Sequence, residues 1–240
     1  MSVIFSKYHG SQNDFLVIDD RDEIFPIDRQ LIASLCHRKK GVGADGILLL
    51  QKSRVADCRM RIFNADGSEA AMCGNGLRCL VAFAREKGAR CETVEVGGRV
   101  VRCSMEGEWI TVDLGHYKWE REGERYLVDV GVPHAVVFVS DHQGVVEHVK
   151  EFSGHINLNF AVFKQDKLYN RTFERGVGET AACGSGAAAV AIAARDLYGM
   201  KNPVTVVPLS EEELKVVVYE DRVLLSGRAV SVFNGVSEEW

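Results

Sequence analysis

The sequence predicts a mixed α/β (α+β) fold with two pseudo-symmetric domains, each a mostly antiparallel sheet wrapped round a central helix. The 240 residues leave room for two domains of workable size. Short runs that alternate apolar with polar residues outnumber helical patterns. The stretch NADGSEAAMCGNGLRC (64–79) also returns in a similar form as ERGVGETAACGSGAAA (174–189). A repeat so widely spaced indicates a duplicated domain rather than a solenoid.

Most of the predicted elements are strands. Each run is short and rich in β-branched or aromatic residues, and several runs alternate in the way that half-buried strands do. The expected strands are residues 3–9, 15–20, 46–51, 58–63, 109–114, 135–140, 158–163, 167–174, 204–208, 214–220 and 223–227.

Three helices are expected. The first covers residues 28–38, with Asp28 as its N-cap, and the basic residues at its end are expected to be solvated. The second follows Cys73, and its apolar residues recur at i, i+3, i+4 and i+7 up to a C-terminal Gly88. The third follows Cys183 and ends at Gly199. It is apolar on nearly every side, which predicts burial all round.

The repeat sets the expected domain boundaries. The N-terminal domain is predicted to cover residues 1–115, joined by the last strand at 229–240, and the C-terminal domain to cover 116–228. The active site is expected in the cleft between them. The polar stretch 115–125 is the best candidate for the boundary, because no Pro- or Ser-rich linker occurs.

Composition excludes several classes of protein. A net charge of −5 with scattered basic residues gives no footprint for nucleic acid or an anionic membrane. The N-terminus lacks signal-peptide features, and no apolar run is long enough to span a bilayer, so we expect a cytoplasmic protein. Seven cysteines without a C-x-x-C pair argue against a disulfide framework or a common zinc site. We therefore expect reduced thiols and no metal.

Two further patterns have simple structural interpretations. GVGADG (41–46) fits G-x-G-x-x-G, but it follows a helix and opens a strand, so we expect a tight turn rather than a dinucleotide site. Five of the cysteines are expected to be small buried hydrophobic residues: Cys36, Cys58, Cys79, Cys91 and Cys103.

Cys73 and Cys183 differ because each begins a helix. A helix N-terminus carries a partial positive charge, which favours a thiolate, and its N–H groups bind carboxylates. Either cysteine alone could be a packing residue, or Cys with His134 could form a nucleophile and base pair. The matched pair favours a cofactor-free racemisation, in which one thiol removes the α-proton and the other delivers a proton to the opposite face.

Taken together, the motifs resemble those of diaminopimelate epimerases. The motifs are HGSQNDF (9–15), GVGADG (41–46), RIFNADGSE (61–69), CGNG (73–76), the Pro133-His134 pair, ERGVGET (174–180) and ACGSG (182–186). The resemblance implies an isomerase that needs no pyridoxal phosphate and interconverts LL- and meso-diaminopimelate, on the route to lysine and peptidoglycan.

The resemblance also implies roles for individual residues. Cys73 and Cys183 match the acid/base pair, and His134 and Glu174 match positions that tune the thiols. The remaining positions bind the substrate. Gly74, Asn75, Gly184 and Ser185 match the helix starts that hold the reacting carboxylate, Asn13 matches a contact near the reacting centre, and Asn64, Asn157, Glu174 and Arg175 match positions that read mainly the distal end.

The chain departs from the family pattern away from the chemical step. Val132 stands where an asparagine usually precedes Pro-His, and Gly46 stands where some members carry a glutamine. We therefore expect relaxed discrimination at the distal end of the substrate, with turnover of glutamate as its sign. The chain is also shorter than usual after Gly115. Phe233 stands where some members have a tyrosine at the subunit interface, and we expect a homodimer.

Other functions stay open at this point. A broader amino acid racemase or a proline or hydroxyproline racemase would also keep two cysteines, and a non-catalytic relative would bind a small molecule and use its cysteines structurally. In any enzyme that uses the two cysteines as an acid/base pair, oxidation that links Cys73 to Cys183 is expected to abolish activity.

Overall fold

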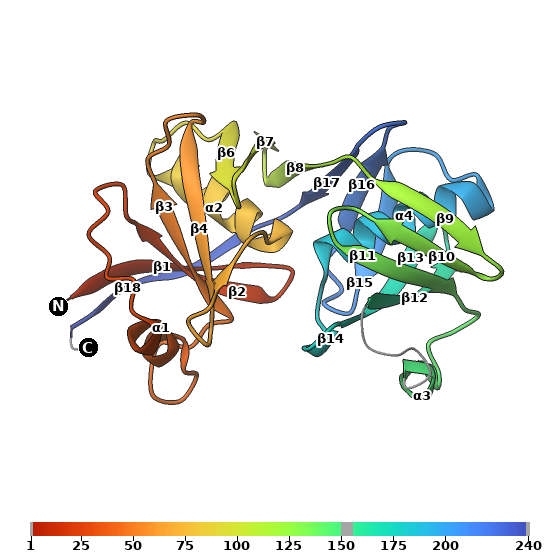
Figure 1. Cartoon of the computed structure of the whole chain (residues 1–240), viewed down its shortest axis with the longest axis horizontal. Helices are drawn as coiled ribbons and strands as arrows, with labels where there is room; N and C mark the ends of the chain where they lie inside the picture. The colour runs from red at the N-terminus through yellow and green to blue at the C-terminus, as the bar shows by residue number, and fades with distance from the viewer. Residues whose placement is uncertain (1, 150–155, 239–240) are drawn as a thin grey trace. The chain divides into compact units, whose positions relative to one another are not determined.

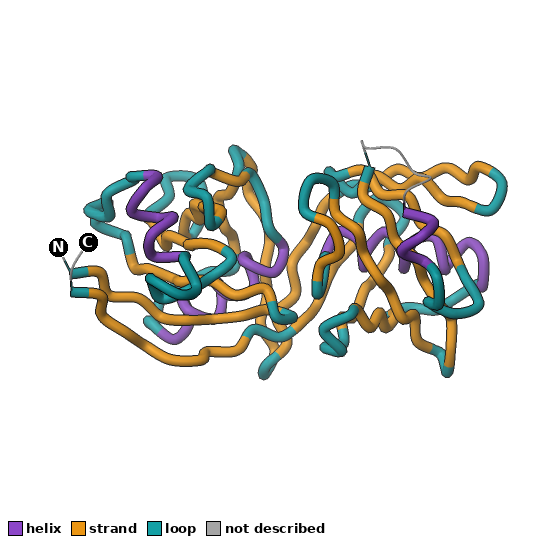
Figure 2. The backbone as a smooth tube through the Cα atoms, turned by 90° about the horizontal axis from the view of Figure 1, so that it is seen from below, coloured by secondary structure: helices purple, strands orange, loops and turns teal. Residues whose placement is uncertain are grey.

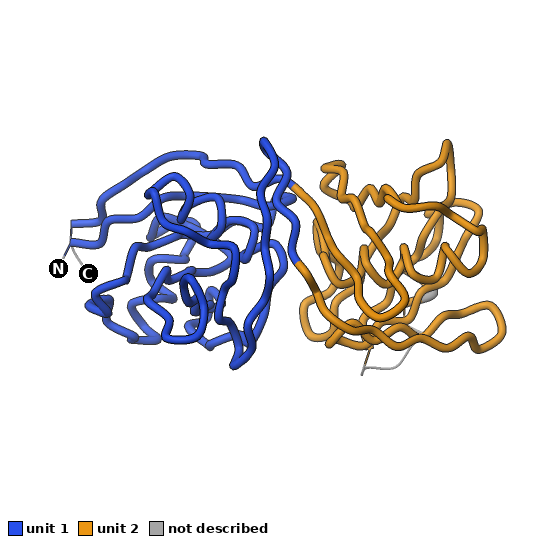
Figure 3. Tube along the Cα trace, turned by 90° about the horizontal axis from the view of Figure 1, so that it is seen from above, with its two compact units in different colours: residues 1–112, 228–240 blue, residues 113–227 orange. Residues whose placement is uncertain are grey.

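A computed structural model describes residues 2–149 and 156–238, and the chain divides into two compact units (Figure 3). Unit 1 comprises residues 1–112 and 228–240, and unit 2 comprises residues 113–227. Strands dominate both units (Figure 2). The mixed α/β class expected from the sequence is confirmed.

The strands of unit 1 pair in one continuous series. From the edge, β18 pairs with β1 and β1 with β2, both antiparallel, and β2 then pairs with β3 in parallel. β4 is antiparallel to β3 and parallel to β6, and β7 and β8 complete the series as antiparallel neighbours. The short β5 pairs with β4. The bounds are β1 (Val3–Gly10), β2 (Asn13–Asp19), β3 (Gly46–Gln51), β4 (Cys58–Asn64), β5 (Glu69–Ala70), β6 (Thr93–Val96), β7 (Arg99–Glu106), β8 (Trp109–Gly115) and β18 (Val230–Ser237).

The strands of unit 2 repeat this series in the same order. β9, β10 and β11 are antiparallel neighbours, β11 and β12 are parallel, and β13 is antiparallel to β12 and parallel to β15. β16 and β17 follow as antiparallel neighbours, and the short β14 pairs with β13. The bounds are β9 (Lys118–Glu122), β10 (Arg125–Asp129), β11 (Pro133–Phe138), β12 (Asn157–Lys164), β13 (Lys167–Glu174), β14 (Gly178–Thr180), β15 (Val204–Pro208), β16 (Leu214–Val218) and β17 (Val223–Gly227).

Each series of strands surrounds one long helix (Figure 1). In unit 2, α4 (Gly184–Tyr198) contacts β10, β11, β12, β13, β15, β16 and β17. Its buried face is mostly alanine, whose small side chain lets backbone approach from several sides. In unit 1, α2 (Gly74–Glu86) contacts β1, β2, β3, β4 and β7. The two remaining helices of the described residues, α1 (Arg29–Cys36) and α3 (Val145–Val149), precede the fourth strand of each series, β3 and β12.

Local signals in the sequence account for the helix ends and for one turn. Asp28 is the N-cap of α1 and accepts from the Leu31 N–H at 2.8 Å. Gly199 ends α4 with a left-handed φ of 64°. The GVGADG segment leads from α1 into β3, and a Cβ on Gly46 would lie 2.3 Å from the Phe63 carbonyl oxygen. The glycine therefore allows β3 and β4 to approach closely.

Six strands were not predicted from the sequence, and two of them, β5 and β14, have only two and three residues. β6, β7, β9 and β10 are short, charged or both, and every residue of β9 is exposed. They form because a neighbouring strand supplies backbone partners, which a pattern of side chains does not reveal. β9 occupies part of the stretch in which a domain boundary was expected. No helix in the described residues is long and apolar enough to cross a membrane.

Candidate functional site

Cys73 occupies the N-cap of α2. Its backbone is extended, with φ −149° and ψ 115°, and its sulfur accepts from the Gly76 N–H at 3.3 Å. A Cβ on Gly76 would meet the side chains of Leu48 and Cys73, so glycine suits the close approach of the helix start to β3. The half-buried thiol therefore sits where the helix dipole favours negative charge.

A polar pair orients Asn13 beside this thiol. The Asn13 Nδ2 donates to the Asp45 carboxylate at 2.9 Å, which turns its Oδ1 the other way. That Oδ1 lies 3.5 Å from the Cys73 Sγ and accepts from Asn75 Nδ2 at 3.4 Å. Arg38 in turn pairs with Asp45 at 2.7 Å. Because Asn13 offers an acceptor, it favours the protonated thiol of Cys73.

Cys183 occupies the equivalent N-cap of α4. Its φ and ψ are −120° and 115°, and its sulfur accepts from the Gly186 N–H at 3.4 Å. Ser185 Oγ lies 3.3 Å from the Cys183 Sγ and 2.9 Å from His134 Nε2. The two thiols thus share one backbone arrangement and differ in the side chains beside them.

A buried network fixes the state of His134. Asn159 Nδ2 donates to His134 Nδ1 at 2.9 Å, which leaves the ring proton on Nε2 for donation to Ser185. Thr172 Oγ1 holds the Asn159 amide in this orientation by donating to its Oδ1 at 2.9 Å. Burial lowers the pKa of His134 to about 4, so the ring is neutral near pH 7. The Ser185 hydroxyl then has its own proton to donate to Cys183, which favours the thiolate there.

The other predicted site residues form separate contacts. His134 and Asn157 face each other across the parallel strands β11 and β12, and Asn157 Oδ1 accepts from the Arg175 N–H at 2.9 Å. Glu174 accepts from Thr180 at 2.7 Å. Asn64, at the end of β4, donates to Ser68 at 2.9 Å.

The polar contacts described above connect some of the predicted residues to Cys73 or Cys183, and they do not connect the others to either cysteine. Cys73 is joined with Asn13 and Asn75, and Cys183 with Ser185 and His134. Asp45, Asn159 and Thr172 were not predicted. Their signal was weak, because Asp45 stood in a stretch interpreted as a turn and the other two occupy ordinary alternating strand positions.

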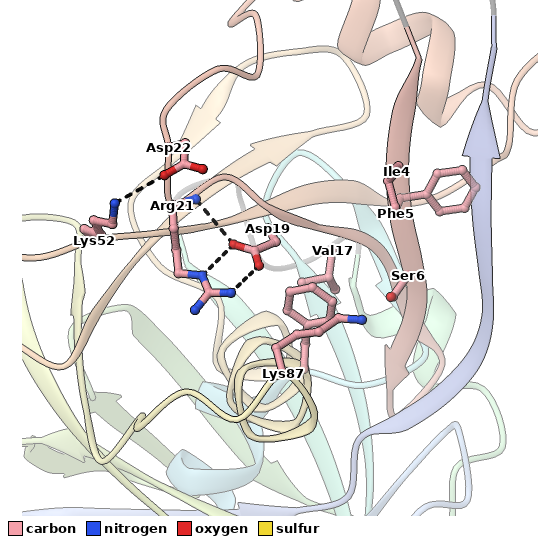
Figure 4. Close-up of a pocket in the computed structure, with 10 residues that line it drawn as sticks. Ile4, Phe5, Ser6, Val17, Asp19, Arg21, Asp22, Lys52 and Lys87 are labelled. Carbon is pink, nitrogen blue, oxygen red and sulfur yellow. Dashed lines mark hydrogen bonds and ion pairs between the residues drawn. The ribbon is translucent and has the colours of Figure 1, made fainter.

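A hollow of about 600 Å³ lies elsewhere in unit 1 (Figure 4). Phe83 and Lys87 line it from the C-terminal end of α2, the end opposite Cys73. Its charged side chains are largely paired with one another, since the Arg21 guanidinium donates two hydrogen bonds to the Asp19 carboxylate and Lys52 forms an ion pair with Asp22 at 3.2 Å. It contains none of the predicted site residues. Within the described residues, no group of three or more His, Cys, Asp or Glu side chains is arranged to hold a metal ion.

Comparison with known proteins gives consistent matches along the sequence. The family model described as diaminopimelate epimerase matches residues 5–120 and 126–232. The diaminopimelate epimerase of Archaeoglobus fulgidus is 36% identical, with 98% of this chain and 96% of that protein covered. That of Methanothrix thermoacetophila is 39% identical, with 97% and 95% covered. The first alignment spans 271 positions, more than the 240 residues here, so the relative has insertions that this chain lacks.

Solved structures match the fold at low identity. A phenazine biosynthesis protein of the PhzF family from Bacillus anthracis matches with a TM-score of 0.76 and 14% identity, covering all of both chains. A hydroxyproline epimerase from Agrobacterium vitis matches with a TM-score of 0.66 and 13% identity, covering 98% of this chain and 92% of the other. These likenesses concern the fold alone, whereas the sequence matches run nearly end to end at well above 30% identity. On that ground this chain is a member of the diaminopimelate epimerase family.

Proposed function

We propose that this chain interconverts LL- and meso-diaminopimelate by exchanging the α-proton between Cys73 and Cys183. The observation that carries the proposal is the pair of cysteines at the N-caps of α2 and α4, in two units with the same order of strand pairings. An epimerisation at carbon needs a base on one face and an acid on the other, and two thiols of equivalent placement meet that need. The activity makes the chain an isomerase.

Within this proposal, the neighbouring side chains determine the protonation state of each cysteine before the substrate reacts. The acceptor of Asn13 holds Cys73 as the thiol, and the hydroxyl of Ser185 supports Cys183 as the thiolate. The resting enzyme is then ready for the isomer whose α-proton faces Cys183. After one turnover Cys183 is the thiol and Cys73 is the thiolate, so the enzyme is ready for the reverse reaction.

The helix starts hold the substrate at its reacting end. Gly74 and Asn75 begin α2, and Gly184 and Ser185 begin α4. Amide N–H groups at a helix N-terminus bind a carboxylate and stabilise the charge that develops on it as the α-proton leaves. No pyridoxal phosphate enters this scheme, because these amides supply the stabilisation that the cofactor would otherwise give.

In this proposal the distal end of the substrate is recognised by four residues, Asn64, Asn157, Glu174 and Arg175. Arg175 is exposed, and its guanidinium suits a carboxylate, while Glu174 suits an ammonium group. Val132 is 40% exposed and has no polar atom in its side chain. We therefore propose weaker discrimination against substrates without the distal amino acid group, such as glutamate.

Exchange of the α-proton with solvent tests the proposed chemistry. In D2O, the wild type should introduce deuterium at Cα of LL-diaminopimelate, and Cys73→Ala and Cys183→Ala should each lose about 10²-fold or more of this activity. Binding measured by calorimetry should survive both changes. Full activity in either variant would refute the two-thiol scheme. Deuterium in hydroxyproline, but not in diaminopimelate, would move the assignment to a hydroxyproline racemase.

A substrate panel tests the proposal about the distal end. L-glutamate should acquire deuterium at Cα and yield D-glutamate, more slowly than diaminopimelate reacts. Val132→Asn should raise the preference for diaminopimelate without lowering its turnover. If the wild type leaves glutamate unchanged, the relaxed specificity is wrong and the two-thiol chemistry is unaffected.

We also propose a homodimer through the outer strand of unit 1. β18 pairs with β1, and its apolar side chains Val232 and Phe233 are 54% and 47% exposed; further along β18, Val236 is 57% exposed and is the register partner of Ile4 of β1. An apolar strand edge of this kind is usually covered in solution. Sedimentation should give a dimer for the wild type and a monomer for Phe233→Glu. A monomeric wild type at micromolar concentration would exclude the dimer.

A further inference from the structure

Unit 1 contains a second pair of cysteines that the proposed reaction does not use. Cys58 begins β4, and Cys91 lies just before β6, the strand that pairs in parallel with β4. Their sulfur atoms are 2.9 Å apart, and both residues are buried. A disulfide bond is about 2.05 Å long, so the two sulfurs need to approach by less than about 1 Å.

A hydrogen-bonded clamp holds the two cysteines in place. The Asp57 carboxylate, next to Cys58, accepts from the Glu92 and Thr93 N–H groups at 3.0 and 2.9 Å and from Thr93 Oγ1 at 2.9 Å. The Asp57 N–H donates back to Thr93 Oγ1 at 3.0 Å. Four hydrogen bonds thus tie the chain beside one thiol to the chain beside the other. The thiols are held at short range by the backbone and not merely by chance side-chain packing.

We propose that Cys58 and Cys91 form a disulfide bond when the chain folds in the presence of a low-molecular-weight disulfide such as oxidised glutathione. The bond would close the loop that contains β4, β5, Cys73 and α2, so it would fasten the segment that carries one thiol of the candidate site. The proposal does not depend on the proposed function, because nothing in it requires catalysis.

The reaction proceeds by two thiol–disulfide exchanges. One protein thiolate attacks oxidised glutathione, forms a mixed disulfide and releases one glutathione thiolate. The second protein thiolate attacks the protein sulfur of the mixed disulfide, forms the Cys58–Cys91 bond and releases the second glutathione. Two electrons pass from the cysteines to glutathione, and the two protons end on the released thiols.

Because the two thiols are buried in the folded chain, we expect the disulfide to form during folding rather than afterwards. The hydrogen bond with Cys58 and burial raise the pKa of the Cys91 thiol well above its usual range, and only a thiolate attacks a disulfide. The folded pair therefore reacts slowly with any oxidant. Once formed, the same burial and the Asp57 clamp protect the bond from reduction.

Refolding with a defined oxidant tests the proposal. The full chain is refolded from urea in a glutathione redox buffer, treated briefly with a low concentration of reduced glutathione, digested without reduction and examined by mass spectrometry. We expect a peptide pair joined between Cys58 and Cys91 and lighter by two hydrogens, while Cys73 and Cys183 return to thiols. Absence of the joined peptides from the wild type would overturn the proposal, whatever the activity of the protein.

Thermal unfolding gives a second readout. Closing a loop whose ends are 33 positions apart should raise the unfolding midpoint of unit 1 by roughly 10 °C in the wild type refolded with the glutathione buffer, relative to wild type refolded in dithiothreitol. Cys91→Ala should abolish this shift. The matched control is Cys103→Ala, since Cys103 is also buried and its N–H donates to the Glu92 carbonyl at 2.8 Å, beside the pair. A shift that persists in Cys91→Ala, or disappears in Cys103→Ala, would contradict the assignment.

Discussion

The buried imidazole of His134 should make unit 2 sensitive to mild acid. The side chain is fully buried, and its Nδ1 accepts from the Asn159 amide, so the folded unit holds the ring neutral. Burial lowers its pKa to about 4, whereas the ordinary value is 6.5. The unfolded chain therefore binds a proton over a pH range in which the folded chain does not.

The sign of the effect follows from this difference. Above pH 6.5 neither state is protonated at His134, and its full contribution to stability is present. As the pH falls from 6.5 towards 4, the unfolded state gains a proton and the free energy of unfolding decreases. At 1.36 kcal/mol per pKa unit, the loss amounts to roughly 3 kcal/mol by pH 4. Replacement of His134 by Gln removes the titrating group and should flatten the curve in this window.

Urea unfolding at several pH values measures the loss. Fluorescence of Trp119 reports unit 2 when the other two tryptophans are replaced by phenylalanine. The control is His116→Gln, which makes the same replacement at an exposed imidazole of the same unit. If the wild type and His134→Gln lose equal stability between pH 6.5 and pH 4, the enclosed neutral histidine is not the cause.

Three further outcomes are expected from unfolding measurements. In Gly186→Ala the new Cβ would lie 2.5 Å from Asn159 Oδ1, so unit 2 should lose about 1–3 kcal/mol and kcat should fall with it. In Gly199→Ala, alanine must adopt the left-handed φ of 64° that ends α4, so the free energy of unfolding of unit 2 should fall by about 1 kcal/mol and kcat should not change. Burial raises the pKa of Asp14, but hydrogen bonds from Arg38 and Lys7 outweigh burial and hold this pKa at about 2. Unit 1 should therefore lose stability as the pH falls from 3.8 towards 2, and the Asp14→Asn variant should not show this loss.

The sequence was a good guide to the elements that begin or end with a strong local signal. Asp28 at an N-cap, Gly199 at a C-terminus and the alanine-rich α4 were all predicted, because backbone requirements act on single residues or on their spacing. The repeat around Cys73 and Cys183 was visible for the same reason. Strands β6, β7, β9 and β10 were missed because their partners, and not their own side chains, determine them.

The candidate site could be predicted only where a motif singles out a residue. Cys73, Cys183 and His134 were predicted from motifs, and their roles stay predictions, whereas Asp45 and Asn159 were not predicted, because each acts through the neighbour that it orients. Asp45 acts on Asn13 from 32 positions away, and Asn159 acts on His134 from 25 positions away. Contacts at such separations depend on strand register, which a single sequence does not display.

Duplication followed by divergence explains how two equivalent cysteines would acquire the opposite resting states of the proposed mechanism. The backbone device is the same in both units, with a thiol at the N-cap that accepts from the N–H three residues later. The side chains beside the thiols differ, since Asn13 lies on the first strand of the parallel pair in unit 1 and His134 lies on the matching strand in unit 2. One presents an acceptor, and the other, through Ser185, presents a donor. In the proposed mechanism the reaction begins with one thiol and one thiolate, and these different neighbours decide which cysteine holds the proton. The similarity of the two halves supplies the pair of thiols, and their difference sets the direction of the first proton transfer.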